Sequence, residues 1–319
     1  MELETLLPPA VQDSDSNYTR ISVLTTKGNS VANAWVTSLG RHPLARRLSD
    51  MVIRDNIGVR LGLPVRPHDP DDPGICMYKN CTKPVDDTLR HAFTCRYNAG
   101  AVKYRHDSVA KAIYNFFYPH RNTLNGKVEM EPNVTTQGGY PPLQPAAAAA
   151  AAAEGDGDEE AAHFGNQIRH RADVGISSEG TYYLLDVTVV HPTKHAKYAE
   201  KPEIKTAEAE TRKMQHYTTN YQVPSAVVIP VALDTFGRLG DIASSFFGSM
   251  ISSIASIRCG IDEPARRAMS QQLRASLNES ISCALARGTS AATRGYQNLR
   301  FRRGMVRQQA EPAGALVPP

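Results

Sequence analysis

Three cysteines and one histidine near the first quarter of the chain have the spacing of metal ligands. They form the pattern C-x4-C-x9-H-x3-C, made of Cys76, Cys81, His91 and Cys95. Zn²⁺ prefers four thiolate or imidazole ligands at the corners of a tetrahedron, and two closely spaced pairs can supply them. Because protein side chains fill all four positions, we predict a structural zinc site. The alternative interpretation is three buried thiols beside a core histidine.

Two aspartates lie on adjacent strand-like runs in the second half of the chain. Asp173 and Asp186 belong to the runs 167–176 and 181–190, which the turn 177–180 joins. Such a hairpin brings the two carboxylates together at one edge of a sheet. Two like charges resist shared ionisation, and a divalent cation such as Mg²⁺ removes that cost. A bound Mg²⁺ can activate water and stabilise a departing phosphate oxygen, so we predict a catalytic Mg²⁺ site here. Taken singly, each aspartate could instead be a turn or cap residue.

A phosphodiester-cleaving site also needs a cationic side chain beside the metal. Lys205 and Lys213 lie on a predicted helix, 201–217, and are the candidates, with Arg171 also close. Glu131 follows a short apolar segment and could add a third carboxylate. His106 stands next to Asp107, and this pair is interpreted as a cap and surface pair at the start of a helix, with an acid/base pair as the alternative.

The elements around these residues predict an α/β fold. From residue 128 onward the expected order is strand, linker, strand, strand, helix, strand, helix, which a mixed sheet flanked by helices satisfies. The last strand, 225–233, contains Pro230 and should therefore lie at a sheet edge or a bulge. Helices are expected at about 241–257 and 264–286. The former is too short and too rich in serine to span a bilayer, so we expect no membrane partner.

The expected domain organisation follows from composition. It comprises a disordered N-terminus (1–29), a helical segment (30–64), the zinc finger (65–100), a core in two pieces (101–134 and 164–258), a low-complexity linker between them (135–163), and a helix with a basic disordered tail (259–319).

The charge distribution predicts a negatively charged partner, and the cysteine content predicts an intracellular protein. The 319 residues are 41% hydrophobic, enough for a core, and the net charge is +4. Residues 154–160 hold five acids, whereas 287–307 hold six arginines and no acid, which favours contact with nucleic-acid phosphates; a solvated charge run is the alternative. The N-terminus has no secretory signal, and five cysteines favour metal ligands or free thiols over disulfides.

An ordered set of these features resembles one known family. The set contains the helical segment from residue 30, the CCHC finger, Lys103 to Asp107, Glu131-Pro132, Arg171 to Asp173, DVTVVHP from Asp186, the helix motif Glu210-x-x-Lys213-x-x-x-Tyr217, and Thr235 to Gly240. Over about residues 30–258 the chain resembles the C-terminal region of non-LTR retrotransposon polyproteins, which carry a restriction-like endonuclease of the PD-(D/E)XK type.

The resemblance implies a PD-(D/E)XK fold, with Asp173 and Asp186 as ligands of the catalytic metal. Threonine occupies position 188, where that pattern usually has lysine. In the retrotransposon branch the lysine has moved to the following helix, so Lys213 is the first choice and Lys205 the second. The resemblance also implies a nuclear protein that nicks DNA. No reverse transcriptase precedes the finger, so we expect a fragment, a decayed element or a domesticated remnant. An inactive DNA- or RNA-binding module and a zinc-stapled interaction protein are the other hypotheses.

Overall fold

One mixed sheet of four strands positions the two aspartates, Asp186 within its third strand and Asp173 directly before its second. Its order is β1 (Val128–Met130), β2 (Val174–Ser178), β3 (Thr181–Val190) and β4 (Ala226–Asp234). The first two pairings are antiparallel, and β3 runs parallel to β4. The expected α/β class with a mixed sheet is therefore confirmed. The computed structural model describes residues 30–37, 48–61, 90–132, 172–192, 203–220 and 226–310, together with positions 63, 75, 76, 78, 81, 83 and 201.

The predicted hairpin is present, but its turn is shorter than the expected 177–180, because Ser177 and Ser178 belong to β2 and only Glu179 and Gly180 form the turn. Glu179 and Gly180 both have positive φ, 51° and 79°, as the two central residues of a tight hairpin turn require. Strand β3 has the predicted bounds, whereas β2 begins at Val174 and the expected start at 167 lies outside the described residues. The two strands differ in length, because β3 has 10 residues and β2 has 5. Beyond the pair Val174–Leu185, β3 is hydrogen-bonded to β4 alone among the described strands.

Strand β4 lies at the edge of the described sheet, as its proline predicted. Pro230 is paired in register with Asp186 and has no backbone N–H to donate. An edge strand tolerates this loss because one side of its ladder has no partner strand.

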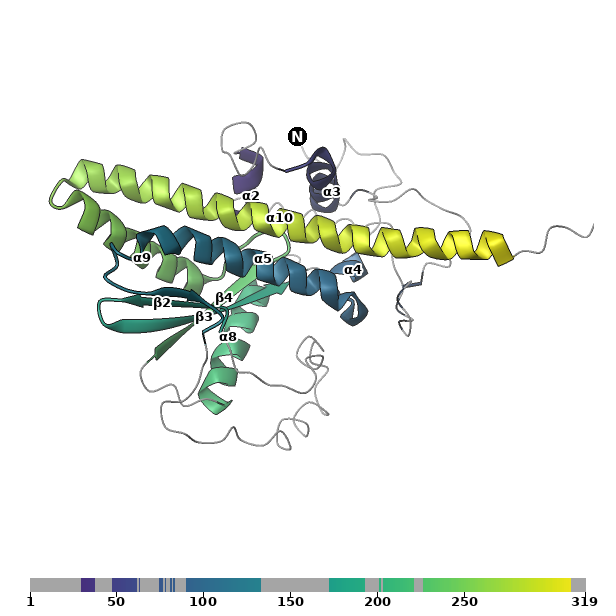
Figure 1. Ribbon diagram of the computed structural model, residues 1–319, viewed down its shortest axis with the longest axis horizontal. Coiled ribbons are helices and arrows are strands. Elements are labelled where there is room, and N and C mark those ends of the chain that lie inside the picture. Colours follow the sequence, from purple (N-terminus) through teal and green to yellow (C-terminus); the bar gives the residue numbers. More distant parts are fainter. Residues whose placement is uncertain are drawn as a thin grey trace, which may run out of the picture.

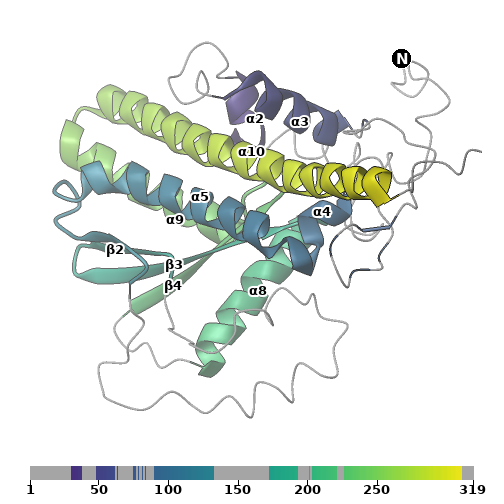
Figure 2. The same cartoon turned by 45° about the vertical axis from the view of Figure 1, so that its right-hand side comes forward.

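Helices form layers on both faces of the sheet (Figure 1). α5 (Ala99–Phe117) and α9 (Asp241–Cys259) pack on one face, and α8 (Glu203–Asn220) packs on the other. α10 (Glu263–Ala310) crosses over α5 and α9, and α2 (Ser30–Thr37) and α3 (Asp50–Leu61) lie on its outer side (Figures 1 and 2). The main core lies between the sheet, α5, α9 and α10, and its wholly buried members include Val109, Ile113, Phe117, Leu185 and Ile254.

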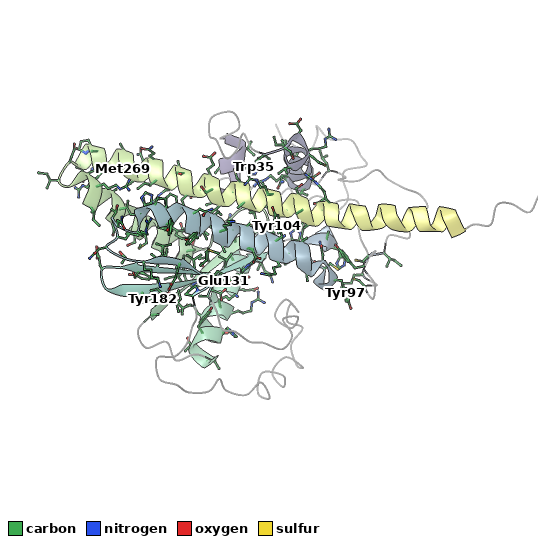
Figure 3. All side chains as sticks on the ribbon, viewed as in Figure 1. Trp35, Tyr97, Tyr104, Glu131, Tyr182 and Met269 are labelled. Atoms are coloured by element: carbon green, nitrogen blue, oxygen red, sulfur yellow. The ribbon has the colours of Figure 1, made fainter. Side chains whose placement is uncertain are left out.

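One helical prediction needs correction. The helix expected at 264–286 extends from Glu263 to Ala310, so the tail expected to be disordered is helical up to that residue. The helical segment 30–64 contains two helices, and Trp35 of α2 packs against Cys283 and Ala286 of α10 (Figure 3). The low-complexity linker 135–163 lies outside the described residues.

Helix α9 is the one described helix whose length and composition would suffice to cross a membrane. Phe246, Phe247, Ile251 and Ile254 are nevertheless buried in the core, whereas Ile242 and Ile257 at its ends are exposed. Gly260 ends the helix with a φ of 58°, and the Asp262 carboxylate accepts the Ala265 N–H at 3.0 Å to begin α10. These features agree with the predicted core helix.

Candidate metal centre and active site

The four predicted finger ligands converge on one point. The Sγ atoms of Cys76 and Cys95 lie 3.7 Å apart, those of Cys95 and Cys81 lie 4.0 Å apart, and Cys81 Sγ lies 3.2 Å from His91 Nε2. All four ligand atoms lie within 4.8 Å of one another, so the group could hold a metal ion. Tetrahedral Zn–S bonds of about 2.3 Å require S···S separations of about 3.8 Å. The spacing is thus compatible with zinc.

Short local elements hold these ligands in place. The Cys76 N–H donates to the Lys83 carbonyl at 2.9 Å and the Cys81 N–H to the Tyr78 carbonyl at 3.1 Å, which closes the first loop. His91 lies on the short helix α4 (Arg90–Thr94), and Cys95 follows it directly. Burial raises the pKa of the Cys76 thiol to about 12. A cation that binds there must therefore displace the thiol protons.

The finger is fixed to the sheet through its helix. Phe93 on α4 packs on His191, with ring centroids 5.4 Å apart, and His191 in turn lies 5.8 Å from the ring of Phe236. The His191 Nδ1 atom is hydrogen-bonded to Thr235 Oγ1 at 2.7 Å. His191 is buried just beyond the end of β3, so it connects the finger to the strand that carries Asp186.

The two aspartates meet at the start of β2, beyond which β3 continues without this partner strand. The Asp173 N–H donates to the Leu185 carbonyl at 2.9 Å, which is the last antiparallel bond of this pair. Two residues further along β3, the Val187 N–H faces the same side and donates to Asp173 Oδ2 at 2.6 Å. The carboxylate thus satisfies a backbone donor that β2 is too short to reach.

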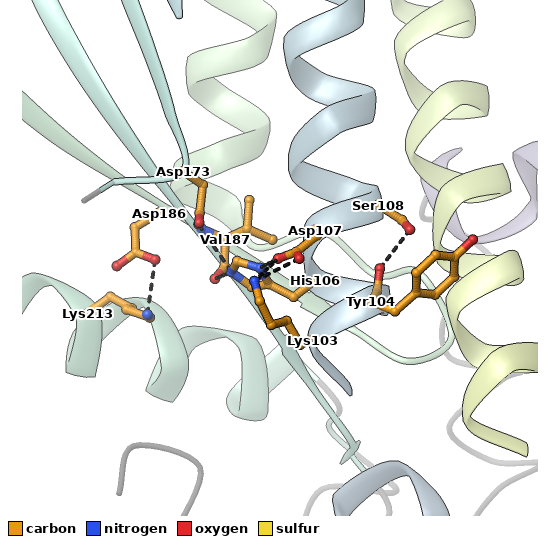
Figure 4. A network of polar contacts seen from close by, with 9 residues as sticks. All are labelled: Lys103, Tyr104, His106, Asp107, Ser108, Asp173, Asp186, Val187 and Lys213. Atoms are coloured by element: carbon orange, nitrogen blue, oxygen red, sulfur yellow. Dashed lines mark hydrogen bonds and ion pairs between the residues drawn. The ribbon is translucent and has the colours of Figure 1, made fainter. Parts of the chain in front are cut away.

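Asp186 is 8% exposed and faces α8. Its Oδ1 atom accepts a hydrogen bond from Lys213 Nζ at 3.0 Å (Figure 4), and the Tyr217 hydroxyl is also bonded to the carboxylate. Burial and the nearby charge of Asp173 raise the pKa of Asp186, whereas Lys213 and Tyr217 oppose that rise. Two carboxylates beside one ammonium carry a net negative charge, which favours the binding of a further cation.

His106 joins this site from the opposite side of the sheet. Its Nε2 atom lies 3.2 Å from Asp173 Oδ2 and 3.0 Å from the Val187 carbonyl oxygen, and its Nδ1 atom lies 3.1 Å from Asp107 Oδ1 (Figure 4). Burial disfavours the charged ring, but the hydrogen bonds to Asp107 and Asp173 and the negative charges nearby raise its pKa to about 10.

The interpretation of His106 as a surface pair at a helix start is wrong. The residue lies well inside α5, which begins at Ala99. A signal was present in the sequence, because His106 shares its helical stripe with Val109 and Ile113, which are buried in the core. A histidine on the core-facing stripe of a helix needs polar partners, and Asp173 provides one of them.

The other candidate residues take different positions. Lys205 lies about 12 Å before Lys213 along the α8 axis, with its Nζ 4.0 Å from Glu208. Glu131 is exposed, and its backbone N–H donates to the Asp173 carbonyl at 2.9 Å (labelled in Figure 3). Its carboxylate does not belong to the described group of potential metal ligands, which consists of His106, Asp173 and Asp186. Arg171 lies outside the described residues.

The donor set determines what this second group can do. The ligand atoms of His106, Asp173 and Asp186 lie within 4.8 Å of one another, close enough to share one cation. Two carboxylate oxygens and an imidazole suit a divalent metal, and the ammonium of Lys213 lies beside them. Comparison with models of protein families gave no match for the chain, and no curated protein matched it.

Proposed function

We propose that this chain is a nucleic-acid-binding protein with a metal-dependent endonuclease site, in which a divalent cation is held by Asp173 and Asp186. The observation that carries the proposal is the meeting of these carboxylates with the Lys213 ammonium, 3.0 Å from Asp186 Oδ1, at the open edge of β3. Restriction-like endonucleases of the PD-(D/E)XK type are the family whose motifs the sequence resembles. The mixed sheet flanked by helices is compatible with that fold.

The side chains would divide the work of hydrolysis. Asp173 and Asp186 would bind the cation, which when bound supplies an activated water and stabilises negative charge on the phosphate. Lys213 would hold the attacking water or the scissile phosphate by a charge-assisted hydrogen bond. The burial of Asp186 strengthens these electrostatic interactions, because the local dielectric constant is lower than in water.

The position of the lysine accounts for the departure at residue 188. In a strand, residues two apart point to the same face, so Thr188 and Asp186 share the face that α8 covers. A lysine on α8 can therefore reach the space where a strand lysine would lie. Lys213 approaches from this helix and contacts Asp186, which supports it over Lys205.

The finger would position the nucleic-acid strand. We propose that Cys76, Cys81, His91 and Cys95 hold a structural zinc ion, because their separations match a tetrahedral site. The finger lies beside α10, since Asn98 donates to the Ala292 carbonyl at 3.4 Å. The six arginines of 287–307 lie on the same helix, and arginines bind backbone phosphates.

The ordered motifs further favour a retrotransposon origin. A nuclear protein that nicks DNA is the form of this function that the resemblance implies. Binding of nucleic acid without cleavage is the alternative, and plasmid nicking separates it from this function.

Plasmid nicking by the zinc-loaded full chain tests the proposal. The wild-type protein is incubated with supercoiled DNA and Mg²⁺ or Mn²⁺, beside Asp173→Asn, Asp186→Asn and Lys213→Met. Each variant should lose about a hundredfold or more of the nicking rate, because each removes a ligand or a charge at the reacting phosphate. Lys111→Met, which changes an exposed lysine of α5, serves as the matched control and should nick normally. A folded, zinc-loaded wild type that binds DNA without nicking it would refute the endonuclease.

A further inference from the structure

The Val187 carbonyl, the Asp173 carboxylate and the His106 ring converge on a single point. His106 Nε2 lies 3.0 Å from the carbonyl oxygen and 3.2 Å from Asp173 Oδ2. With Asp186, the ligand atoms of the two carboxylates and the ring lie within 4.8 Å of one another. Once a metal ion displaces the proton from Nε2, the imidazole offers a lone pair to that cation, as the two carboxylates and the carbonyl do.

A second feature fixes the direction in which the ring points. The Nδ1 atom of His106 faces Asp107 Oδ1 at 3.1 Å, and Lys103 Nζ holds that carboxylate at 2.8 and 3.0 Å (Figure 4). A carboxylate beside one ring nitrogen keeps the proton on that nitrogen. The other nitrogen is then free of a proton and can bind a metal through its lone pair. This arrangement of carboxylate, histidine and metal recurs around protein metal ligands.

We infer that His106 is the third protein ligand of the catalytic cation, and that the resulting His–Asp–Asp site prefers Mn²⁺ to Mg²⁺. This inference rests on the proposed function, because Asp173 and Asp186 are its other two ligands. Mg²⁺ favours oxygen ligands and retains its waters, whereas an imidazole nitrogen favours transition metals. Mn²⁺ accepts both carboxylate and imidazole ligands, so the mixed donor set selects it.

The alternative role for His106 is that of a positive charge which only neutralises the carboxylates. A ring in that role makes no bond to the metal, and its replacement by a neutral amide would leave affinity for a divalent cation unchanged or improve it. The two roles therefore predict opposite results for His106→Gln.

Binding of Mn²⁺ to the zinc-loaded full chain, followed by electron paramagnetic resonance, tests the inference without any activity assay. We expect ¹⁴N modulation from a coordinated imidazole in the wild type, and at least tenfold tighter binding of Mn²⁺ than of Mg²⁺ in competition. His106→Gln should lose the ¹⁴N signal and at least tenfold in Mn²⁺ affinity, with a smaller loss for Mg²⁺. Asp107→Asn should weaken Mn²⁺ binding by about tenfold, because it removes the outer partner of the ring.

Controls separate this inference from the proposed function. His120→Gln, at a histidine of the 3-10 turn Tyr118–His120 outside the group, should bind Mn²⁺ as the wild type does. If Asp186→Asn abolishes Mn²⁺ binding while His106→Gln keeps both affinity and ¹⁴N signal, the inference is overturned and the metal-dependent endonuclease stands. If neither substitution changes binding, the cation lies elsewhere and both proposals fail.

Discussion

Asp234 offers a test of the electrostatics at the turn on which the finger docks. It is 0% exposed at the end of β4, and its Oδ1 atom accepts the N–H groups of Phe236 at 2.8 Å and of Arg238 at 2.9 Å. Its Oδ2 atom is buried with no hydrogen-bond partner among the described residues. Burial raises the pKa of Asp234 to about 6, against these hydrogen bonds and the charges of Arg238 and Arg60.

A raised carboxyl pKa makes the native state bind more protons than the unfolded state at intermediate pH. Stability therefore falls as the pH rises from the unfolded value of 3.8 through the folded value of about 6. The shift corresponds to about 3 kcal/mol in total, of which roughly 1.4 kcal/mol accumulates between pH 5 and pH 8. Asp234→Asn keeps the Oδ1 acceptor but carries no charge at any pH.

The assay is urea denaturation of wild type and Asp234→Asn at several pH values with saturating zinc. The free energy of unfolding of the variant, relative to wild type, should increase by about 1.4 kcal/mol from pH 5 to pH 8. Because only the change of this difference with pH is used, any pH-independent effect of the amide on stability cancels. Asp50→Asn makes the same substitution at an exposed position on α3 and is the matched control. A difference that is flat or falls with pH for Asp234→Asn would refute the reasoning.

Two further predictions concern the finger and the turn beside it. Cys81→Ser should lose bound zinc and lower the melting temperature, whereas Cys259→Ser, which changes a thiol on α9 outside the cluster, should keep one zinc per chain by metal analysis. Gly237→Ala should destabilise the fold by about 2 kcal/mol or more, because φ is +95° and a Cβ would lie 2.9 Å from the Ala32 Cα. Gly180→Ala has a φ of +79° with open space around it, so it measures the conformational cost alone; equal losses by thermal denaturation would show that the contact with Ala32 contributes nothing.

Local patterns predicted the parts of the fold that local chemistry determines. The apolar run LLDVTVV and the turn residues before it predicted the bounds of β3, because a strand of this kind is specified by its own residues and its turn. Ligand spacing likewise predicted that Cys76, Cys81, His91 and Cys95 converge, since few arrangements satisfy such closely spaced pairs. Pro230 indicated an edge strand through the N–H it lacks.

Features that depend on distant segments could not be read in the same way. Helix α10 begins within one residue of the predicted start but continues far beyond residue 286 along α5 and the finger, and its sequence gave no stop signal strong enough to fix its C-terminal end. The place of His106 depends on how α5 crosses the sheet, which no short window of sequence contains. Which of Lys205 and Lys213 reaches Asp186 also depends on how α8 packs on the sheet, because the two lysines lie about two helical turns apart.

The open edge of β3 links the site to the fold itself. Because β2 begins only at Val174, the backbone N–H and carbonyl of Val187 have no partner on that side among the described strands, and buried backbone groups require partners. The Asp173 carboxylate accepts the Val187 N–H, and His106 Nε2 faces the Val187 carbonyl. The side chains proposed to bind a cation therefore also satisfy the backbone of β3. A substitution at either residue therefore disturbs backbone hydrogen bonding as well as metal binding. Loss of nicking alone cannot separate these two effects, which is why Mn²⁺ affinity, the ¹⁴N signal and stability must be measured on the same variants.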